Sequence, residues 1–130
     1  MPVKSKALLD TSCLIALADK EHGWEFVRDI RKNSGVSLIN LSEFVSVIAK
    51  RGATSYDIKA MVSTLAVESI QLTADIAFLA GELIVHTKKF GLSLGDRVCI
   101  ATGILCDIPI YTADQIWTKL DLDCDIRLIR

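Results

Sequence analysis

This 130-residue sequence has no long apolar run, no close cysteine pair and almost no net charge, and each absence excludes a class of protein. The longest apolar run near the amino terminus covers residues 13–18, whereas a membrane-spanning helix needs about 20 such residues. Lys4 and Lys6 make the first residues basic, but no apolar stretch with a small-residue cleavage site follows them. The sequence therefore predicts a cytoplasmic protein without a membrane segment.

Cysteine and histidine are sparse and scattered, which argues against a metal site built from them. None of the cysteines has a Cys-x-x-Cys spacing, so a zinc knuckle is not expected. Their neighbours are aliphatic, which favours buried, reduced thiols at Cys13, Cys99, Cys106 and Cys124. His22 and His86 show no metal-ligand spacing, and we expect both at the surface.

The charges nearly cancel, because 15 lysines and arginines face 16 aspartates and glutamates, leaving a net charge of −1. A protein that held nucleic acid by its overall field would be basic. If this chain handles RNA, local groups or a bound cation must therefore supply the attraction. The apolar share of 51% is enough for one sizeable core, so we expect a single domain over residues 1–130 with some apolar surface left for a partner.

Strand-like and helix-like segments alternate along the chain, which is typical of a parallel sheet covered by helices. The predicted strands cover residues 3–10, 36–39, 67–72, 109–112 and 125–129. The predicted helices cover residues 13–18, 24–32, a third segment capped by Asn40 or Ser42 and ending at Gly52, 54–65, a long segment 73–91, a segment opened by Asp96, and a short one from Asp114. We expect a three-layer α/β/α sandwich with five strands.

Four acidic residues border the ends of these predicted strands. Asp10 ends the first strand, and Asp114 lies just past the fourth. Asp96 opens the helix before the fourth strand, and Glu43 lies in the first turn of the helix after the second. Because the carboxyl ends of parallel strands meet at one edge of a sheet, the four carboxylates are expected to converge.

Carboxylates held close together repel, and one takes up a proton unless a cation lies between them. Mg²⁺ binds through a few carboxylates while keeping several waters. It also lowers the pKa of a bound water and neutralises charge that develops on a phosphate. The acids therefore favour phosphodiester hydrolysis. Each also has a structural explanation, as a helix N-cap for the aspartates or a first-turn acid for Glu43, but the shared location favours function.

Four short motifs surround the acids: Leu8-Leu9-Asp10-Thr11-Ser12, Asn40-Leu41-Ser42-Glu43-Phe44, Gly95-Asp96-Arg97-Val98-Cys99-Ile100-Ala101-Thr102 and Tyr111-Thr112-Ala113-Asp114-Gln115-Ile116-Trp117. In this order, over nearly the whole chain, they resemble the PIN-domain family, particularly the VapC-type toxins of toxin–antitoxin modules. One departure is Gly103, where a second alanine is frequent in the family; it concerns packing and leaves the acids intact.

The resemblance implies the strand order 3-2-1-4-5 and an endoribonuclease that depends on Mg²⁺ or Mn²⁺. It implies that Asp10 and Asp96 bind the metal directly, and that Glu43 and Asp114 complete the site directly or through water.

It further implies that Thr11 and Thr112 orient a carboxylate or a water by hydrogen bonding. The implied partners are an RNA substrate, a cognate antitoxin laid over the site and a second copy of the chain.

Two other functions stay open at this point. A phosphoacceptor signalling domain needs an aspartate at the end of the third strand and a lysine after the fifth. Here the third strand ends at Leu72-Thr73, and the only bases near the last strand are Arg127 and Arg130. A non-catalytic RNA- or protein-binding scaffold of the same fold is disfavoured by the net charge and by the complete set of acids.

Several other side chains have both a structural and a functional interpretation. Arg97 is suited to a phosphate contact, but adjacent helix positions point about 100° apart, so we expect it on a solvated face. The basic pairs at 50–51 and 88–89 suit helix C-termini, with RNA contact as the alternative. Residues 24, 26 and 27, two aromatics and a valine, are expected in the core, with an antitoxin groove as the alternative.

Overall fold

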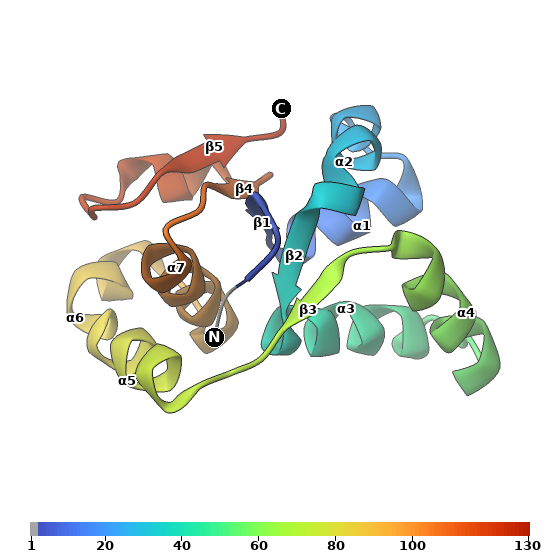
Figure 1. Cartoon of the computed structure of the whole chain (residues 1–130), viewed down its shortest axis with the longest axis horizontal. Coiled ribbons are helices and arrows are strands. Elements are labelled where there is room, and N and C mark those ends of the chain that lie inside the picture. The colour runs from blue at the N-terminus through green and yellow to red at the C-terminus, as the bar shows by residue number, and fades with distance from the viewer. Residues whose placement is uncertain (1–2) are drawn as a thin grey trace.

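Five short parallel strands form the central sheet of this computed structural model, which describes residues 3–130 (Figure 1). Residues 1 and 2, the start of the predicted 1–130 domain, lie outside the described residues. The strands are β1 (Ala7–Leu9), β2 (Ser34–Ser37), β3 (Glu68–Ile70), β4 (Ile110–Thr112) and β5 (Ile126–Leu128). Their order in the sheet is β3-β2-β1-β4-β5. The predicted α/β fold and strand order are confirmed.

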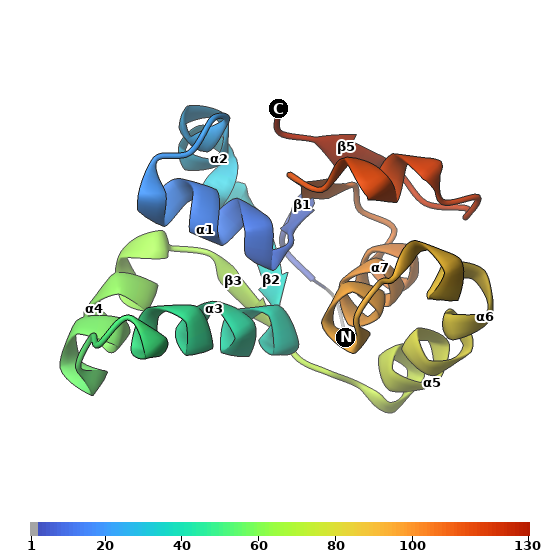
Figure 2. The ribbon, with the colours of Figure 1, turned by 180° about the vertical axis from the view of Figure 1, so that it is seen from behind.

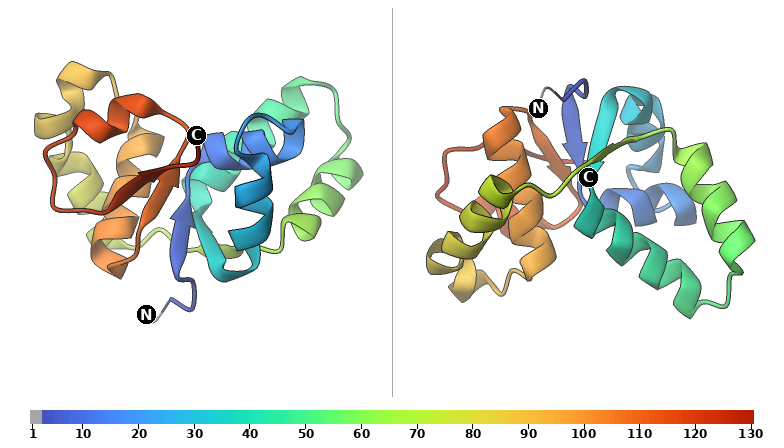
Figure 3. Two further views of the ribbon diagram at one scale, coloured as in Figure 1. Left: turned by 90° about the horizontal axis from the view of Figure 1, so that it is seen from above. Right: turned by 60° about the horizontal axis from the view of Figure 1, so that its bottom comes forward.

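Helices cover both faces of the sheet, as the two views in Figure 3 show. They are α1 (Thr11–Asp19), α2 (Trp24–Ile30), α3 (Leu38–Lys50), α4 (Ser55–Leu65), α5 (Ala74–Glu82), α6 (Ile84–Thr87) and α7 (Leu94–Cys106). Three 3₁₀ turns join them: η1 (Arg31–Asn33), η2 (Lys88–Phe90) and η3 (Gln115–Lys119).

The sheet separates two apolar cores, because successive strand residues point to opposite faces. Leu8 packs with the α5–α7 side, where it joins Val98 and Trp117 in one cluster. Leu9 packs with the α1–α4 side, where it joins Val27 and Phe44 in the other. Leu8 and Leu9 are both fully buried, so β1 is the centre of the molecule. The residue that follows, Asp10, is therefore placed between the two helical layers.

The second strand was predicted two residues too late. It covers Ser34–Ser37 rather than 36–39, and α3 begins at Leu38. The reason is the cap: the Ser37 Oγ accepts a hydrogen bond from the Asn40 backbone N at 3.1 Å. Ser37 is therefore the N-cap, not Asn40 or Ser42, and the apolar residues after it form the first helical turn.

The predicted long helix 73–91 is interrupted. It divides into α5, α6 and η2, with the break at Leu83 between α5 and α6. The Leu83 carbonyl accepts a hydrogen bond from the Thr87 side chain at 2.9 Å, and Gly91 closes η2 in the left-handed conformation. The break turns the chain back toward the sheet before α7.

Two other expectations concern the whole chain. No helix within residues 3–130 is both long enough and apolar enough to cross a membrane. All four cysteines are free, but only Cys13 and Cys99 are buried as predicted; Cys106 and Cys124 are half-buried.

Candidate active site

Three of the four predicted acids lie at strand ends or helix starts. Asp10 follows β1 directly and caps α1, Asp114 follows β4 and caps η3, and Asp96 lies in the first turn of α7. Glu43 is the sixth residue of α3, in its second turn rather than in the first turn as predicted, because α3 begins earlier, at Leu38. In Figure 2 the starts of α1 and α3 face α7 near the centre of the molecule. Helix N-termini carry partial positive charge, which offsets part of the carboxylate charge.

Asp10 is held by donors on both carboxylate oxygens. Its Oδ1 accepts from the Ser12 Oγ at 2.6 Å and from the Cys13 backbone N at 3.0 Å. Its Oδ2 accepts from the Thr112 Oγ1 at 2.5 Å. The residue is 4% exposed, and this burial raises the pKa of its carboxyl above the ordinary value, although the hydrogen bonds pull it down. A negative charge at Asp10 is therefore costly unless a cation accompanies it.

The two hydroxyls that hold Asp10 also hold the turn after β4. The Thr112 Oγ1 accepts from the Asp114 backbone N at 3.0 Å, and the Ser12 Oγ accepts from the Ala113 backbone N at 2.9 Å. Asp10 and Asp114 are thus fixed relative to each other through Thr112, whose side chain is fully buried.

Glu43 is positioned by α1 and by its own helix. Its Oε1 accepts from the Thr11 Oγ1 at 2.8 Å and from the Asn40 Nδ2 at 2.9 Å. The Asn40 side chain is buried, and its Oδ1 accepts from the Ser37 Oγ at 2.6 Å. Gly95 makes room for the carboxylate, because a Cβ on Gly95 would collide with the Glu43 carboxylate atoms.

Asp96 belongs to a capping box. Its Oδ2 accepts from the Ser93 backbone N at 2.9 Å, and its own N donates to the Ser93 Oγ at 3.2 Å. Asp96 is therefore the third residue of α7, not its opening residue as predicted; Ser93 is the N-cap. Burial raises the pKa of Asp96, and the negative charges of Glu43 and Asp114 raise it further.

A buried thiol lies beneath the acids. Burial raises the pKa of the Cys99 thiol well above its usual value, and the charges of Asp10, Asp96 and Glu43 raise it further. Cys99 lies one helical turn along α7 from Asp96.

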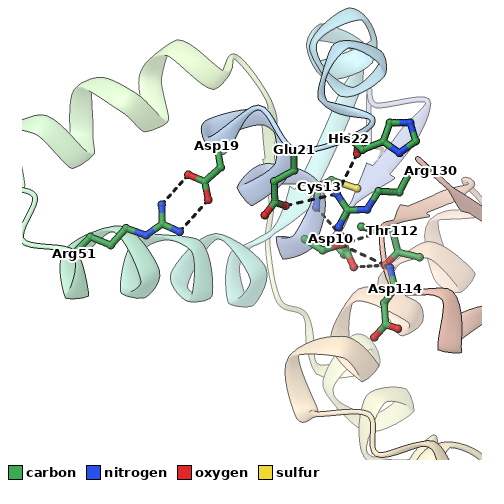
Figure 4. Close-up of polar contacts among 11 residues, drawn as sticks. Asp10, Cys13, Asp19, Glu21, His22, Arg51, Thr112, Asp114 and Arg130 are labelled. Atoms are coloured by element: carbon green, nitrogen blue, oxygen red, sulfur yellow. Dashed lines mark hydrogen bonds and ion pairs between the residues drawn. The ribbon is translucent and has the colours of Figure 1, made fainter.

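Asp114 is the most loosely associated member. Figure 4 shows its carboxylate pointing away from Asp10, although Thr112 lies between the two residues. Its Oδ1 accepts from the Ile116 backbone N at 3.0 Å, and the side chain is exposed. Within residues 3–130 no group of three or more His, Cys, Asp or Glu side chains is arranged to hold a metal ion. Glu43 is joined to the segments of Asp10 and Asp96 through Thr11 and Gly95, and Asp114 is joined to Asp10 through Thr112.

Ion pairs brace the far ends of α1 and α3 and the loop that follows α1. Arg51 contacts Asp19 with two hydrogen bonds, at 2.8 and 2.9 Å, and so ties the end of α3 to the end of α1 (Figure 4). Arg130 donates to the His22 carbonyl at 3.0 Å and lies 3.6 Å from Glu21. The C-terminal residue is thereby held against the loop between α1 and α2.

Three residues of the site were missed at the level of sequence: Ser12, Asn40 and Gly95 serve Asp10 or Glu43 directly. Asn40 precedes Glu43 by three residues, a spacing that places two side chains on one helix face and signals the contact. Ser12 follows Asp10 by two residues, a spacing at which an aspartate side chain commonly accepts a hydrogen bond from the chain that follows it. The contact of Gly95 with Glu43 joins residues far apart in sequence and has no local signal.

Some of the other expectations need correction. Arg97 is half-buried rather than solvated: its Nη1 donates to the Ala80 carbonyl at 3.3 Å, and its Nε is buried without a partner. His22 and His86 are exposed, as expected. Of the three residues expected in the core near α2, only Val27 is buried; Trp24 is half-buried and Phe26 is exposed.

The first and fourth strands are neighbours where the strand order of the parallel sheet reverses, and Asp10 and Asp114 follow their carboxyl ends. In open α/β folds ligands bind at this place, so the molecule is an α/β protein with acids at its binding edge. The model of the PIN domain family matches residues 7–122, and the chain belongs to this family. No curated protein matches the chain by sequence.

Solved structures share the fold at low identity. The DNA-bound VapBC of Salmonella typhimurium has a TM-score of 0.77 at 17% identity, covering 97% of this chain and 99% of that one. VapBC2 of Rickettsia felis, bound to a DNA fragment from its promoter, gives 0.74 at 16% identity, with 94% and 97% covered. VapC20 of Mycobacterium tuberculosis, a toxin that cleaves the sarcin–ricin loop, gives 0.73 at 19% identity, with 87% and 93% covered.

Proposed function

We propose that this protein is a metal-dependent endoribonuclease that cleaves RNA phosphodiester bonds. The observation that carries the proposal is the set of contacts that joins the acids. Thr11, next to Asp10, donates to the Glu43 carboxylate, and Gly95, next to Asp96, lies against that carboxylate. Thr112 joins the Asp10 carboxylate to the Asp114 backbone. Four carboxylates at one sheet edge are costly to the fold unless they serve a cation.

The donor set suits a hard divalent cation such as Mg²⁺, with Mn²⁺ as an alternative. All four side chains offer oxygen only, and Mg²⁺ needs just one or two carboxylates because it keeps several waters. Within residues 3–130 no three such side chains are arranged to hold one metal ion, and a cation that needs only one or two carboxylates is compatible with that arrangement. Asp10 and Asp96 would hold the ion directly, and Glu43 and Asp114 directly or through water. The ion would lower the pKa of a bound water and neutralise charge on the phosphate.

The chain's own residues keep the cluster in register for that ion. Thr112 and Ser12 orient the Asp10 carboxylate, and Thr11 with Asn40 orients Glu43. The capping box with Ser93 restricts Asp96. Each acid therefore has a fixed direction before any ligand arrives, and such preorganisation reduces the reorganisation that the reaction requires.

We further propose that the protein acts in the cytoplasm as the toxin of a toxin–antitoxin module. Support comes from PIN-family membership and from the shared fold with VapBC complexes and with VapC20. An antitoxin and a second copy of the chain are the proposed protein partners. An apolar groove of about 710 Å³ between α3 and α4, lined by Leu41, Val45, Ile58 and Val62, offers a surface for the apolar face of an antitoxin helix.

The test is cleavage by purified single variants. Asp10→Asn and Asp96→Asn are expected to lower the rate of RNA cleavage by roughly 100-fold or more, because each removes a charge from the metal-holding set. Circular dichroism and the melting temperature are expected to show an intact fold. Asp57→Asn is the matched control, since Asp57 is an exposed first-turn acid on α4, away from the site. EDTA should abolish wild-type cleavage and Mg²⁺ or Mn²⁺ should restore it.

Full cleavage by both variants would refute the assignment of these carboxylates. The same proteins expressed in cells give a second readout, growth arrest by the wild type and not by Asp10→Asn. Cleavage without arrest would identify a housekeeping nuclease, and binding of RNA without any cleavage would identify a scaffold.

A further inference from the structure

A basic pocket lies between two segments that border Asp114 and Asp96 along the chain, and neither acid lines it. The pocket has a volume of about 270 Å³ and lies between the α6–η2 segment and η3. Figure 2 and the left view of Figure 3 show these segments side by side. The lining residues are Val85, His86, Lys89, Phe90, Lys119 and Asp121.

The bases around this pocket lack carboxylate partners. His86, Lys89 and Lys119 line the pocket and are all exposed, and within residues 3–130 none of them forms an ion pair. Asp121, the one acid in the lining, lies beyond ion-pair distance of them. The Lys89 Nζ lies over the Phe90 ring at 5.1 Å, which restrains that side chain locally. In a chain of net charge −1, this is a local excess of positive charge.

The pocket is attached at both walls to segments that carry catalytic acids. η3 begins directly after Asp114 and ends at Lys119, so at about 2 Å per residue the lysine lies roughly 10 Å along from the acid. The opposite wall, η2, leads through Gly91 to the capping box of Asp96. Trp117, 1% exposed and packed in the core, fixes η3 to the body of the protein.

A structural explanation exists for each lysine alone. Lys88 and Lys89 lie at the end of η2 and Lys119 at the end of η3, where cations suit the carbonyl end of a helix. That explanation does not require the two helix ends to meet over one pocket, nor the bases to remain without carboxylates. An anionic ligand accounts for both features.

We propose that this pocket binds a backbone phosphate of the RNA substrate on the Asp114 side of the scissile bond. The inference rests on the proposed ribonuclease function. It identifies positively charged side chains that attract RNA, which the overall net charge of the chain does not do. Lysine binds phosphate as a point charge without reading the base, so the contact positions the RNA and leaves sequence choice to other residues.

Binding of RNA to a cleavage-deficient protein tests the pocket. In the Asp10→Asn background, a fluorescein-labelled 12-nucleotide oligouridylate is titrated by anisotropy between 50 and 200 mM KCl, without divalent ions. These concentrations are roughly the range over which phosphate contacts show their salt dependence. The double substitution Lys89→Gln/Lys119→Gln is expected to weaken binding about tenfold and to flatten the slope of log affinity against log salt by about 0.7, because the contact with one phosphate is lost.

The matched control is Lys6→Gln/Lys32→Gln, which removes the same charge from the opposite end of the strands. Both control lysines are exposed, and within residues 3–130 neither forms an ion pair. The control is expected to bind the oligomer as the Asp10→Asn protein does, and Lys89→Arg/Lys119→Arg is expected to retain binding. Equal affinity and slope in the Gln pocket variant and the Gln control, or no binding of the oligomer at 50 mM KCl, would overturn the proposal.

Inorganic phosphate separates an RNA contact from a site for free phosphate. If phosphate alone shifts the backbone amide resonances of Lys89 and Lys119 at micromolar concentration and the oligomer does not compete, the pocket serves a free anion and the proposal fails.

Cleavage assays with otherwise wild-type protein distinguish failure of the pocket from failure of the nuclease assignment. Pocket-dependent RNA binding without cleavage by wild-type protein would remove the nuclease assignment and leave the pocket. Cleavage by wild-type protein, together with RNA binding that the pocket substitutions do not change, would keep the nuclease assignment and remove the pocket.

Discussion

At Asp10 two opposing effects set the charge of one carboxylate. Burial raises its pKa, whereas hydrogen bonds from Ser12, Thr112 and Cys13 stabilise the charged form and lower it. Thr112 matters most for the architecture, because its Oγ1 both donates to Asp10 and accepts from the Asp114 backbone. Removing that hydroxyl therefore affects protonation, position and stability together.

Thr112→Val is expected to raise the pKa of Asp10 further and to move the acidic limb of the cleavage-rate profile to higher pH. Thr112→Ser keeps the hydroxyl and should leave that limb near the wild-type position. The valine variant should also lose about 1–3 kcal/mol of stability, because a buried acceptor and the Asp114 backbone N lose their partner. Rate–pH profiles and urea unfolding measure the two effects. Superimposable profiles for the valine and serine variants would contradict the role of the hydroxyl.

At the scale of elements, the site depends on the close approach of α7 to α3. Gly95 is buried, and the Glu43 carboxylate occupies the space that a Cβ at this position would need. The Asn40 Nδ2 also lies 3.4 Å from the Gly95 carbonyl, so the contact involves backbone as well as side chain. Gly95 therefore serves the site as a point of close packing, at the cost of helix propensity.

Gly95→Ala is expected to displace Glu43 and to lower the cleavage rate at least tenfold, since a small misplacement of a reacting group has effects of this order or larger. The helix itself gains roughly 1 kcal/mol from alanine, which offsets part of the steric cost. Gly81→Ala on α5 is the control, because a Cβ there meets nothing within 4 Å. It should stabilise the protein by about 0.5–1 kcal/mol and leave cleavage unchanged. Wild-type cleavage by Gly95→Ala would show that Glu43 has room to move.

Much of the fold was predictable from the order of elements, because buried strands and amphipathic helices differ in period. The strand order came from the resemblance to the PIN-domain family, since periodicity alone does not rank strands. The boundaries of β2 were misplaced because the four residues 36–39 suit a strand, and only the Ser37 cap decides where α3 begins. The break at Leu83 was missed as well; there the Leu83 carbonyl accepts a hydrogen bond from the Thr87 side chain, and the segment contains no proline.

The positions of three proposed acids were predictable, because Asp10 and Asp114 each follow a strand and Asp96 lies in the first turn of a helix, and parallel strands end at one edge of the sheet. The residues that surround and support these acids were not predictable. Gly95 meets Glu43, and Lys89 meets the wall that carries Lys119, only after the chain has folded. Arg97 shows the same limit: a helix-phase argument placed it in solvent, whereas the packing of α5 against α7 buries half of it.

At the scale of the whole molecule, the buried acids are expected to make the stability of the fold depend on pH, and the proposed metal binding to make it depend on divalent cations. Asp10 and Asp96 both have folded pKa values raised above the ordinary value of 3.8. The folded state therefore binds these protons more tightly than the unfolded chain does. The stability they contribute is fully present below the unfolded pKa and is lost as pH rises through the folded values. Above that window the folded protein holds repelling charges, which a divalent ion would relieve.

We therefore expect the melting temperature in EDTA to fall as pH rises above 4, and Mg²⁺ to restore it at pH 7.5. One site filled at one hundred times its dissociation constant adds about 2.7 kcal/mol, which is a shift of several degrees for a domain of this size. Asp10→Asn should melt at or above the wild-type temperature in EDTA, because it removes the buried charge and keeps the shape, and should gain little from Mg²⁺. Differential scanning calorimetry with KCl matched for ionic strength measures the effect. Identical wild-type melting with Mg²⁺ and with KCl would mean that the carboxylates hold no divalent ion.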